Sequence, residues 1–576
     1  MVALAVRQRR TLRESEAAFV VVAAIVGVGA GVLTNFQGLL AHAMQGFLYG
    51  VDANRLSALG AIHHPWRLLA LPFGGLLLVG LAYLLRRRAR TPIDVVEANA
   101  LHGGRVPFTD SMVVAAQTIV SNGSGASVGL EAAYAQVGGG LASILGQWFR
   151  LRRNDLRTLV GAGAGAAVGA AFGAPLTGAF YAFEIVIGNY TPPAIAPVIA
   201  ATLSAASVTR LLGVEPYLLA TTSDRTFTTA DYGAYAVLGL LCAALGILIM
   251  RLVTSTELLV QSWGRLGRWR PFLGGCLLIP IAWLSPQALS AGHGALHLDL
   301  ALRPTMLFLA VVLVLKIAAS VVSLSFGFRG GLFFASLFLG SLLGQLFAGL
   351  LNALPIGLHL DPNDAALVGM AALSVAVVGG PMTLAMLMLE TTHDFRLMGV
   401  VLTATLVSST CTREWFGYSF STWRLHLRGS MLRSPRDIGR TATLTARKMM
   451  RADWVSVAPD MTVAAFRAAI PLGSASKAIL VDAQGRYCGI IPTAAAYRPD
   501  LDPADRIAPL AILGDVGLSP ETGVRDTLKA FDNAAADELA VVDSAGNLIG
   551  IVTEKHARRR YAEEIEATQR EMFGEA

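Results

Sequence analysis

The chain has 576 residues, of which 54% are hydrophobic and 15% are charged, and its mean hydropathy is +0.56. Soluble domains are about one quarter charged, so this composition excludes an ordinary soluble globular protein and indicates an integral membrane protein surrounded by lipid. The net charge of +7 is not gathered in a basic segment interleaved with aromatic residues. A nucleic-acid partner is therefore not expected.

Arginines flank the first two apolar segments of the chain. The first apolar run is too long for a cleavable signal peptide and lacks its small-residue cleavage site. Because positive residues favour the cytoplasmic side, we expect cytoplasmic N- and C-termini in a plasma membrane or bacterial inner membrane. The arginines are Arg7, Arg9, Arg10 and Arg13 before the first segment, and Arg86, Arg87, Arg88 and Arg90 after the second.

Apolar segments continue to residue 412, and several are too short or too rich in glycine to be clean spans of about 20 residues. Broken helices at membrane depth are tolerated only where protein buries them or where they line a cavity. The pattern therefore predicts a channel or transporter core rather than a simple anchor. The segments lie at about 17–42, 66–85, 128–149, 158–188, 193–213, 231–253, 272–285, 305–325, 328–352, 364–390 and 396–412.

Two short patterns are each written twice. Gly129–Ala133 returns as Gly331–Ala335 at an offset of 202 residues, and Gly173–Glu184 returns as Gly379–Glu390 at an offset of 206 residues. Two halves built alike, with interrupted helices near membrane depth, indicate a transport site at the repeat interface. The predicted halves span about 17–213 and 231–412 of a membrane domain at 1–429.

A loop of permissive residues precedes each copy of the first pattern. Asn122–Gly125 comes before Gly129, Gly327–Gly330 comes before Gly331, and each loop leads into a long apolar helix. A helix N-terminus carries unpaired N–H groups and a partial positive charge, so it binds anions. Two such termini facing one point would make an anion site without a fixed cation. This suits conduction, because a full charge could hold an ion too tightly.

The two copies differ at one ionisable position, where Glu131 in the first copy is replaced by Phe333 in the second. An ionisable residue inside a membrane segment is costly and indicates function. Its carboxylate could compete with an anion for the helix-end amides, and protonation would release it and open the path. The alternative is a carboxylate that caps its own helix start. The two interpretations are compatible.

The composition changes near residue 430, where charged residues and Asp-Pro turns replace the apolar segments. After a linker at 430–443, a domain at 444–576 contains two strand–turn–strand units, at about 444–500 and 507–565. Short β-branched runs joined by a glycine turn predict hairpins. The segment VVDSAGNLIGIVTE at 541–554 resembles the core of a CBS (cystathionine-β-synthase-type) motif, so the tail resembles a small α+β tandem CBS domain.

Paired CBS motifs often bind adenine nucleotides, but this tail departs from the pattern that such binding uses. The usual Thr-x-x-Asp, whose aspartate holds a ribose, is replaced by Thr553–His556 in the second motif and by Pro492–Ala495 in the first. A structural dimerisation or gating module and a nucleotide-binding module both stay open. No other cofactor and no metal is expected.

Three membrane segments resemble motifs of the CLC chloride channel and transporter family. Residues 125–143 (GASVGLEAAYAQVGGGLAS) resemble its G-[KR]-E-G-P segment, and residues 170–184 (AAFGAPLTGAFYAFE) resemble its A-P-L-x-G-x-x-F-x-x-E segment. Residues 330–344 (GGLFFASLFLGSLLG) resemble its G-x-F-x-P segment. The resemblance implies an α-helical membrane protein with an inverted repeat of broken and re-entrant helices and a cytoplasmic CBS pair. It also implies a homodimer with one chloride path per subunit.

The resemblance assigns roles to particular residues. Glu131 resembles the gating glutamate, and Phe333 resembles the aromatic residue beside the ion path, although plain core packing of Phe333 is the alternative. The amides that bind chloride would come from the two helix starts. The anion-binding residues so implied are Gly129, Leu130, Glu131, Leu332, Phe333 and Phe334.

Departures from the family pattern lie around the ion path. In the family's G-S-G-x-P segment, whose serine contacts the anion, the best register places Ala89 at the serine, unless the neighbouring arginines simply continue a basic loop. At the inner end, Ser421 or Thr422 replaces a tyrosine, with Tyr418 a few residues upstream. Either hydroxyl is a candidate anion ligand, but the bulky inner barrier would be missing.

Ile185 is the departure with the largest consequence. Exchangers of the family commonly carry paired glutamates of which the second relays protons, whereas this chain has Glu184 followed by Ile185, which cannot carry a proton. The sequence therefore favours a gated chloride channel, and proton-coupled chloride exchange is the alternative. A fluoride-selective variant is also open because the anion-contacting segments are altered, although fluoride branches generally lack the CBS tail.

Two other classes of function agree less well with the residues. A membrane sensor that works through its CBS pair and has lost transport would not need Glu131 and Phe333. An enzyme is not expected, because no Ser-His-Asp or Cys-His grouping is visible. His63-His64 also has no third ligand at metal-binding spacing.

Overall fold

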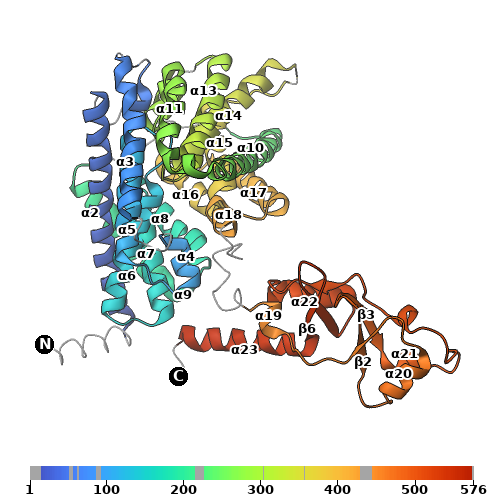
Figure 1. Ribbon diagram of the computed structural model, residues 1–576. Coiled ribbons are helices and arrows are strands. Elements are labelled where there is room, and N and C mark those ends of the chain that lie inside the picture. Colours follow the sequence, from blue (N-terminus) through green and yellow to red (C-terminus); the bar gives the residue numbers. More distant parts are fainter. Residues whose placement is uncertain are drawn as a thin grey trace. The chain divides into compact units, whose positions relative to one another are not determined.

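The computed structural model describes residues 15–50, 56–60, 62, 64–85, 92–214, 226–302, 304–355, 357–427 and 444–573 (Figure 1). The chain forms two compact units, a membrane unit at Met1–Arg436 and a tail at Asp437–Ala576. The two predicted arginine clusters, the register through Ala89, His63 and the linker at 430–443 lie outside the described residues.

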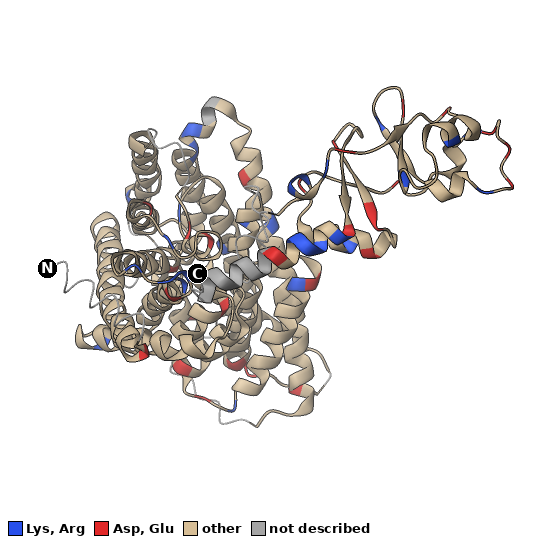
Figure 2. Cartoon of the chain, turned by 90° about the horizontal axis from the view of Figure 1, so that it is seen from below, with Lys and Arg blue, Asp and Glu red and all other residues tan. Residues whose placement is uncertain are grey.

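Helices build the membrane unit, and six of those described are long and apolar enough to cross a membrane: α2, α3 with the turn before it, α9, α10, α13 and α14. Charged residues are sparse along these helices (Figure 2). The first half contains α2 (Glu16–Tyr49), η1 (Leu56–Ala58), η2 (Pro65–Leu69), α3 (Ala70–Leu84), α4 (Val95–Leu101), α5 (Phe108–Gly123), α6 (Glu131–Trp148), α7 (Arg153–Phe172), α8 (Pro175–Tyr181), the π-helical η4 (Ala182–Ile187) and α9 (Pro192–Leu211). The second half contains α10 (Thr229–Gln261), η5 (Gly264–Trp269), α11 (Arg270–Leu284), η6 (Pro286–Ala288), α12 (His293–Leu302), α13 (Met306–Ser325), α14 (Phe333–Ala353), α15 (Pro362–Val378), α16 (Pro381–Thr392) and α17 (Met398–Trp415), and α18 (Phe420–Leu427) follows it.

The offset of 202 residues seen in the sequence is also an offset between structural elements. α5 and α13 end at Gly123 and Ser325, and α6 and α14 begin at Glu131 and Phe333. The loops between them bend at Gly125 (φ 91°) and Gly327 (φ 97°), a left-handed conformation that glycine adopts without steric cost. Both halves therefore interrupt the chain in the same way at the same place.

Glycines bring the helices behind these loops into close contact. In the first half α6 packs on α7, where a side-chain carbon at Gly138 would collide with the Gly163 carbonyl. In the second half α14 packs on α15, where a side-chain carbon at Gly340 would collide with the Gly369 carbonyl. Small residues at such crossings let two membrane helices approach backbone to backbone, which fixes α6 and α14 rigidly.

The tail repeats one α+β pattern at an offset of 61 residues. In each copy a short strand lies parallel to the first strand of a β-hairpin, giving three-stranded sheets of order β1-β2-β3 and β4-β5-β6. The predicted hairpins are β2–β3 and β5–β6. The elements are α19 (Ala446–Met449), β1 (Ser456–Val457), α20 (Val463–Ala469), β2 (Lys477–Val481), β3 (Tyr487–Pro492), α21 (Thr493–Ala496), η8 (Ala508–Leu510), β4 (Gly517–Leu518), α22 (Val524–Ala534), β5 (Glu538–Val542), β6 (Leu548–Thr553) and α23 (Glu554–Phe573).

The two copies of the tail pack against each other. Arg486 and Asn547, which occupy equivalent positions in the two hairpin turns, form an antiparallel bridge. Ile479, Ile490 and Ile551 share a small buried cluster between the sheets. The tail is therefore one paired unit rather than two independent modules.

Candidate functional site

Gly129 and Gly331, the first residues of the two copies, pair with each other. The Gly129 N–H donates to the Gly331 carbonyl at 2.9 Å, and the Gly331 N–H donates to the Gly129 carbonyl at 3.1 Å. The bridge is antiparallel, as expected for two copies related by a two-fold axis. Because α6 and α14 begin two residues later, the structure brings the two predicted helix starts together.

Neither helix start carries a side-chain cap. Leu130 and Leu332 stand at the N-cap positions. Their carbonyls accept the first helical hydrogen bonds, from the N–H groups of Ala133 and Tyr134 in α6 and of Ser336 in α14. The N–H groups ahead of those bonds have no partner within their helix, so each first turn offers donors to an anion.

Glu131 lies at this junction. Its side chain is 4% exposed, and its Oε2 atom accepts no hydrogen bond from any residue that the structure describes. The same oxygen would collide with a side-chain carbon at Gly129 and would lie 3.7 Å from one at Gly331. The carboxylate therefore folds back over the paired glycines, at the positive end of its own helix.

Phe333 and Phe334 form an aromatic wall beside the junction and are 4% and 0% exposed. The ring of Phe172, at the end of α7, lies 5.3 Å from Phe333 and 6.2 Å from Phe334. The ring of Tyr181 in α8 lies 6.4 Å from Phe333. Phe333 thus packs in the core and borders the helix starts, so both interpretations of this residue agree with its position.

Buried polar side chains hold the loop that leads to Glu131. Asn122 donates to the Val128 carbonyl at 2.8 Å, and Gln45 donates to Asn122 Oδ1 at 2.9 Å. The Ser290 N–H donates to the Gly125 carbonyl at 3.0 Å. Because these bonds come from three different segments, the loop has little freedom to move when the carboxylate does.

Lys316 of α13 is a buried basic residue that sequence reading did not identify. It is 0% exposed, and its Nζ atom donates to the carbonyls of Ser290 at 2.6 Å and Ala288 at 3.2 Å. Ser290 is the residue whose N–H donates to the Gly125 carbonyl, so the lysine nitrogen lies directly behind the loop. A lysine inside an apolar span was a visible signal, because charged residues are costly there.

Glu184 of the first half caps a helix of the second half, and Glu390 of the second half caps the equivalent helix of the first. Glu184 accepts hydrogen bonds from the N–H groups of Met382 (3.2 Å) and Thr383 (2.9 Å) and from the Thr383 hydroxyl (2.7 Å), at the start of α16. Glu390 accepts the three equivalent bonds from the start of α8, at 2.7–2.8 Å. Both carboxylates are therefore engaged in structure, and the next residue, Ile185, is buried and apolar.

Ser421 and Thr422 of α18, the two candidate anion ligands at the inner end, differ in exposure. Ser421 is exposed, whereas Thr422 is buried. The Thr422 hydroxyl accepts a hydrogen bond from the Ser419 N–H and donates one to the Ser419 carbonyl. Phe420 is 8% exposed and belongs to the same buried core as Phe333. Phe420 could not be identified from the sequence, because the motif register placed Ser421 or Thr422 at the inner end instead.

The comparisons with known proteins place the membrane unit and the tail in described families. A family model described as voltage gated chloride channel matches residues 74–413, and a CBS domain model matches residues 515–563. The voltage-gated ClC-type chloride channel ClcB of Escherichia coli, from strains O81 (ED1a) and K12 (DH10B), is 26% identical over 360 residues. The match covers 61% of this chain and 84% of ClcB.

Solved structures share the fold. A slow cyanobacterial Cl−/H+ antiporter is 22% identical with a TM-score of 0.63, covering 71% of this chain and 97% of its own. A eukaryotic CLC transporter is 21% identical with a TM-score of 0.59, covering 93% and 97%, and a CLC-type fluoride/proton antiporter is 22% identical with a TM-score of 0.59, covering 69% and 96%. Because the family model covers more than half of the chain, the protein belongs to the CLC family of membrane anion transporters, with a C-terminal CBS pair.

Proposed function

We propose that this protein is a chloride channel whose gate is Glu131. The observation that carries the proposal is the position of the Glu131 carboxylate over the Gly129–Gly331 bridge, with Oε2 unbonded among the described residues. A carboxylate is itself an anion, so it takes the place that the two helix starts offer to chloride. Protonation removes its charge, releases it from the helix starts, and admits chloride.

The channel mode rests on Ile185. A proton that travelled to Glu131 from the far side of the membrane would need titratable groups along its way, and Ile185 is buried and apolar at the family's relay position. Proton-coupled exchange is the second candidate, because two of the solved relatives are named as antiporters. A fluoride-selective protein is a variant of this second candidate.

Reversal potentials in liposomes under crossed chloride and pH gradients separate the two modes. A channel reverses at the chloride equilibrium potential whatever the pH gradient, and this is the expected result. A reversal potential that moves with the pH gradient at fixed chloride would mean coupled exchange. Replacing chloride with fluoride in the same liposomes checks the selectivity.

Lys316 is proposed to favour the anion electrostatically from behind the loop. A buried charge near an ion path contributes on the order of 1 kcal/mol at an effective dielectric of about 20, which corresponds to roughly fivefold in chloride affinity. We expect K316M to lower chloride flux by about that factor and K316R to keep most of it. Equal flux in K316M and the wild type, measured by chloride efflux from liposomes, would remove Lys316 from the account.

The tail is proposed to be a structural or gating module rather than a nucleotide sensor. At the position of the ribose-binding aspartate the two copies carry Ala495 and His556, and neither offers a carboxylate. We expect ATP at millimolar concentration to leave the thermal stability of the full-length protein unchanged. A rise of several degrees would show binding, because a ligand that prefers the folded state stabilises it.

The family resemblance supports a proposal on quaternary structure and orientation. We propose a homodimer with cytoplasmic termini. Ile195 and Leu203 of α9 and Leu406 of α17 are 45–51% exposed, and these apolar side chains are ones that a second copy would cover. A purely monomeric species in detergent, measured by multi-angle light scattering, would contradict the dimer.

A further inference from the structure

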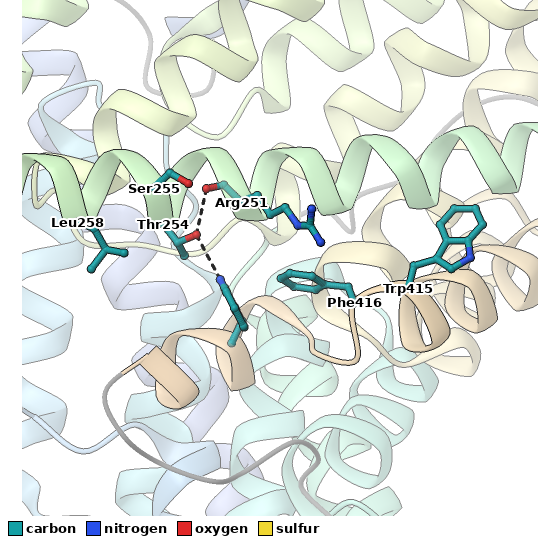
Figure 3. Close-up of a pocket in the computed structure, with 7 residues that line it drawn as sticks. Arg251, Thr254, Ser255, Leu258, Trp415 and Phe416 are labelled. Carbon is teal, nitrogen blue, oxygen red and sulfur yellow. Dashed lines mark hydrogen bonds between the residues drawn. The ribbon is translucent and has the colours of Figure 1, made fainter. Parts of the chain in front are cut away.

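A pocket opens where the second half of α10 meets the end of α17 and the start of α18 (Figure 3). Its volume is about 440 Å³, within the range of small-molecule sites. Arg251 and Ser255 of α10 line one side, and Trp415, Phe416 and the ring of Trp423 line the other. The pocket is distinct from the Gly129–Gly331 junction and has no part in the gating proposed above.

The polar groups of the pocket are cationic and neutral. The Arg251 guanidinium lies 5.7 Å above the Phe416 ring, and no carboxylate among the described residues forms an ion pair with it. The nearby Glu257 carboxylate is engaged by Arg424 at 3.5 Å. The Ser255 side chain is exposed at the pocket. An anion entering the pocket would therefore meet one guanidinium and one hydroxyl, and no acidic side chain lines the pocket.

The pocket lies at the edge of the apolar part of the membrane unit. α10 has 33 residues and is about 50 Å long, whereas the hydrocarbon core of a bilayer is about 30 Å thick. Arg251 stands near the end of its apolar run, and past it Leu258 is 56% exposed. Trp415 is 54% exposed, and tryptophan prefers the membrane–water boundary. One wall of the pocket thus suits acyl chains while its cation suits a headgroup.

We infer that this pocket binds the headgroup of an anionic phospholipid. Arg251 would bind the phosphate, because a guanidinium matches a phosphate with two parallel hydrogen bonds, and Ser255 would donate a further one. An acyl chain would lie along Trp415, on the side of Arg251 that faces the apolar run of α10 (Figure 3). A free phosphate would gain nothing from that apolar wall, and a zwitterionic lipid would place its own cation near Arg251.

An occupant would join α10 to α18. Trp423 Nε1 already donates to Thr254 Oγ1 at 3.3 Å, and Thr254 is a pocket residue. At the start of α18, Ser419 lies beside Gly379, where its Cβ would be 3.9 Å from an added side-chain carbon. A bound lipid would therefore restrict the motion of α18 relative to the end of α15, which precedes α16. The lipid composition of the membrane would in this way affect the stability of the membrane unit.

The test is a titration of delipidated full-length protein in neutral detergent with dioctanoyl phosphatidylglycerol, followed by thermal stability. We expect saturable stabilisation in the wild type and an apparent Kd at least tenfold weaker in R251Q. R413Q is the matched control, because Arg413 is exposed in the last turn of α17 and lies outside the pocket lining. It should bind as the wild type does.

Two parallel titrations, with inorganic phosphate and with a zwitterionic lipid, test whether the pocket prefers an anionic lipid. Equal stabilisation by inorganic phosphate, or by dioctanoyl phosphatidylcholine, would overturn the proposal, as would an unchanged Kd in R251Q. S255A, which should weaken binding about threefold, provides the same comparison if R251Q does not fold. Amide hydrogen exchange adds a local readout: at a phosphatidylglycerol concentration near the wild-type Kd, exchange in α18 should slow in the wild type but not in R251Q.

Discussion

Replacing Glu131 with glutamine is expected to free chloride transport from its dependence on pH. Glutamine keeps the shape of the side chain but carries no charge at any pH, so it cannot compete with chloride for the N–H groups of the two helix starts. We expect the wild type to conduct several times better at pH 4.5 than at pH 7.5. E131Q should stay within about twofold of the acidic wild-type rate across that range, as measured by chloride efflux from liposomes.

Two variants control this experiment. E131D keeps a carboxylate and should keep a dependence on pH. E16Q removes an exposed acidic residue from the first turn of α2, away from the junction, and should behave as the wild type. An E131Q protein that still follows pH like the wild type would show that another group gates the path.

Replacing Glu390 with alanine should destabilise the membrane unit by about 2–4 kcal/mol. The change leaves two N–H groups and the Thr177 hydroxyl at the start of α8 without their acceptor, and hydrogen bonds to charged groups contribute about 1.5–3 kcal/mol each when they are shielded from water. Partial exposure of Leu176 keeps the estimate below the sum. Denaturant unfolding in detergent measures the difference.

Glu184 and Glu390 make equivalent caps in the two halves, so the loss of stability expected for E390A can be checked at Glu184. E184A removes the equivalent three bonds from α16 and should cost a similar amount. T177V removes one bond of the three and should cost about 1 kcal/mol. If E390A and E184A unfolded at the wild-type denaturant concentration, the reciprocal caps would have no structural role.

Much of the fold could be predicted because it depends on local sequence patterns, namely apolar segments, repeated glycine motifs and strand–turn–strand units. The family, the helical membrane fold and the CBS pair are confirmed by the comparisons and the structure. The offset of 202 residues between Gly129 and Gly331 predicted two similar helix starts, and the structure pairs these two residues in an antiparallel bridge. The roles of individual site residues remain predictions.

The contacts that the sequence could not reveal join distant segments. Nothing near Glu184 predicts that it caps α16, about 200 residues away, because capping depends on the packed arrangement of the two halves. The position of Lys316 behind the loop depends likewise on Ser290, which comes from a different segment.

The central claim is that the starts of α6 and α14 bind an anion for which the Glu131 carboxylate competes. Anomalous diffraction from crystals soaked in bromide tests it most directly. The account predicts a bromide peak within hydrogen-bonding distance of first-turn N–H groups beside the Gly129–Gly331 bridge, stronger in E131Q than in the wild type. Bromide bound elsewhere in the membrane unit, with none at the bridge in E131Q, would contradict it.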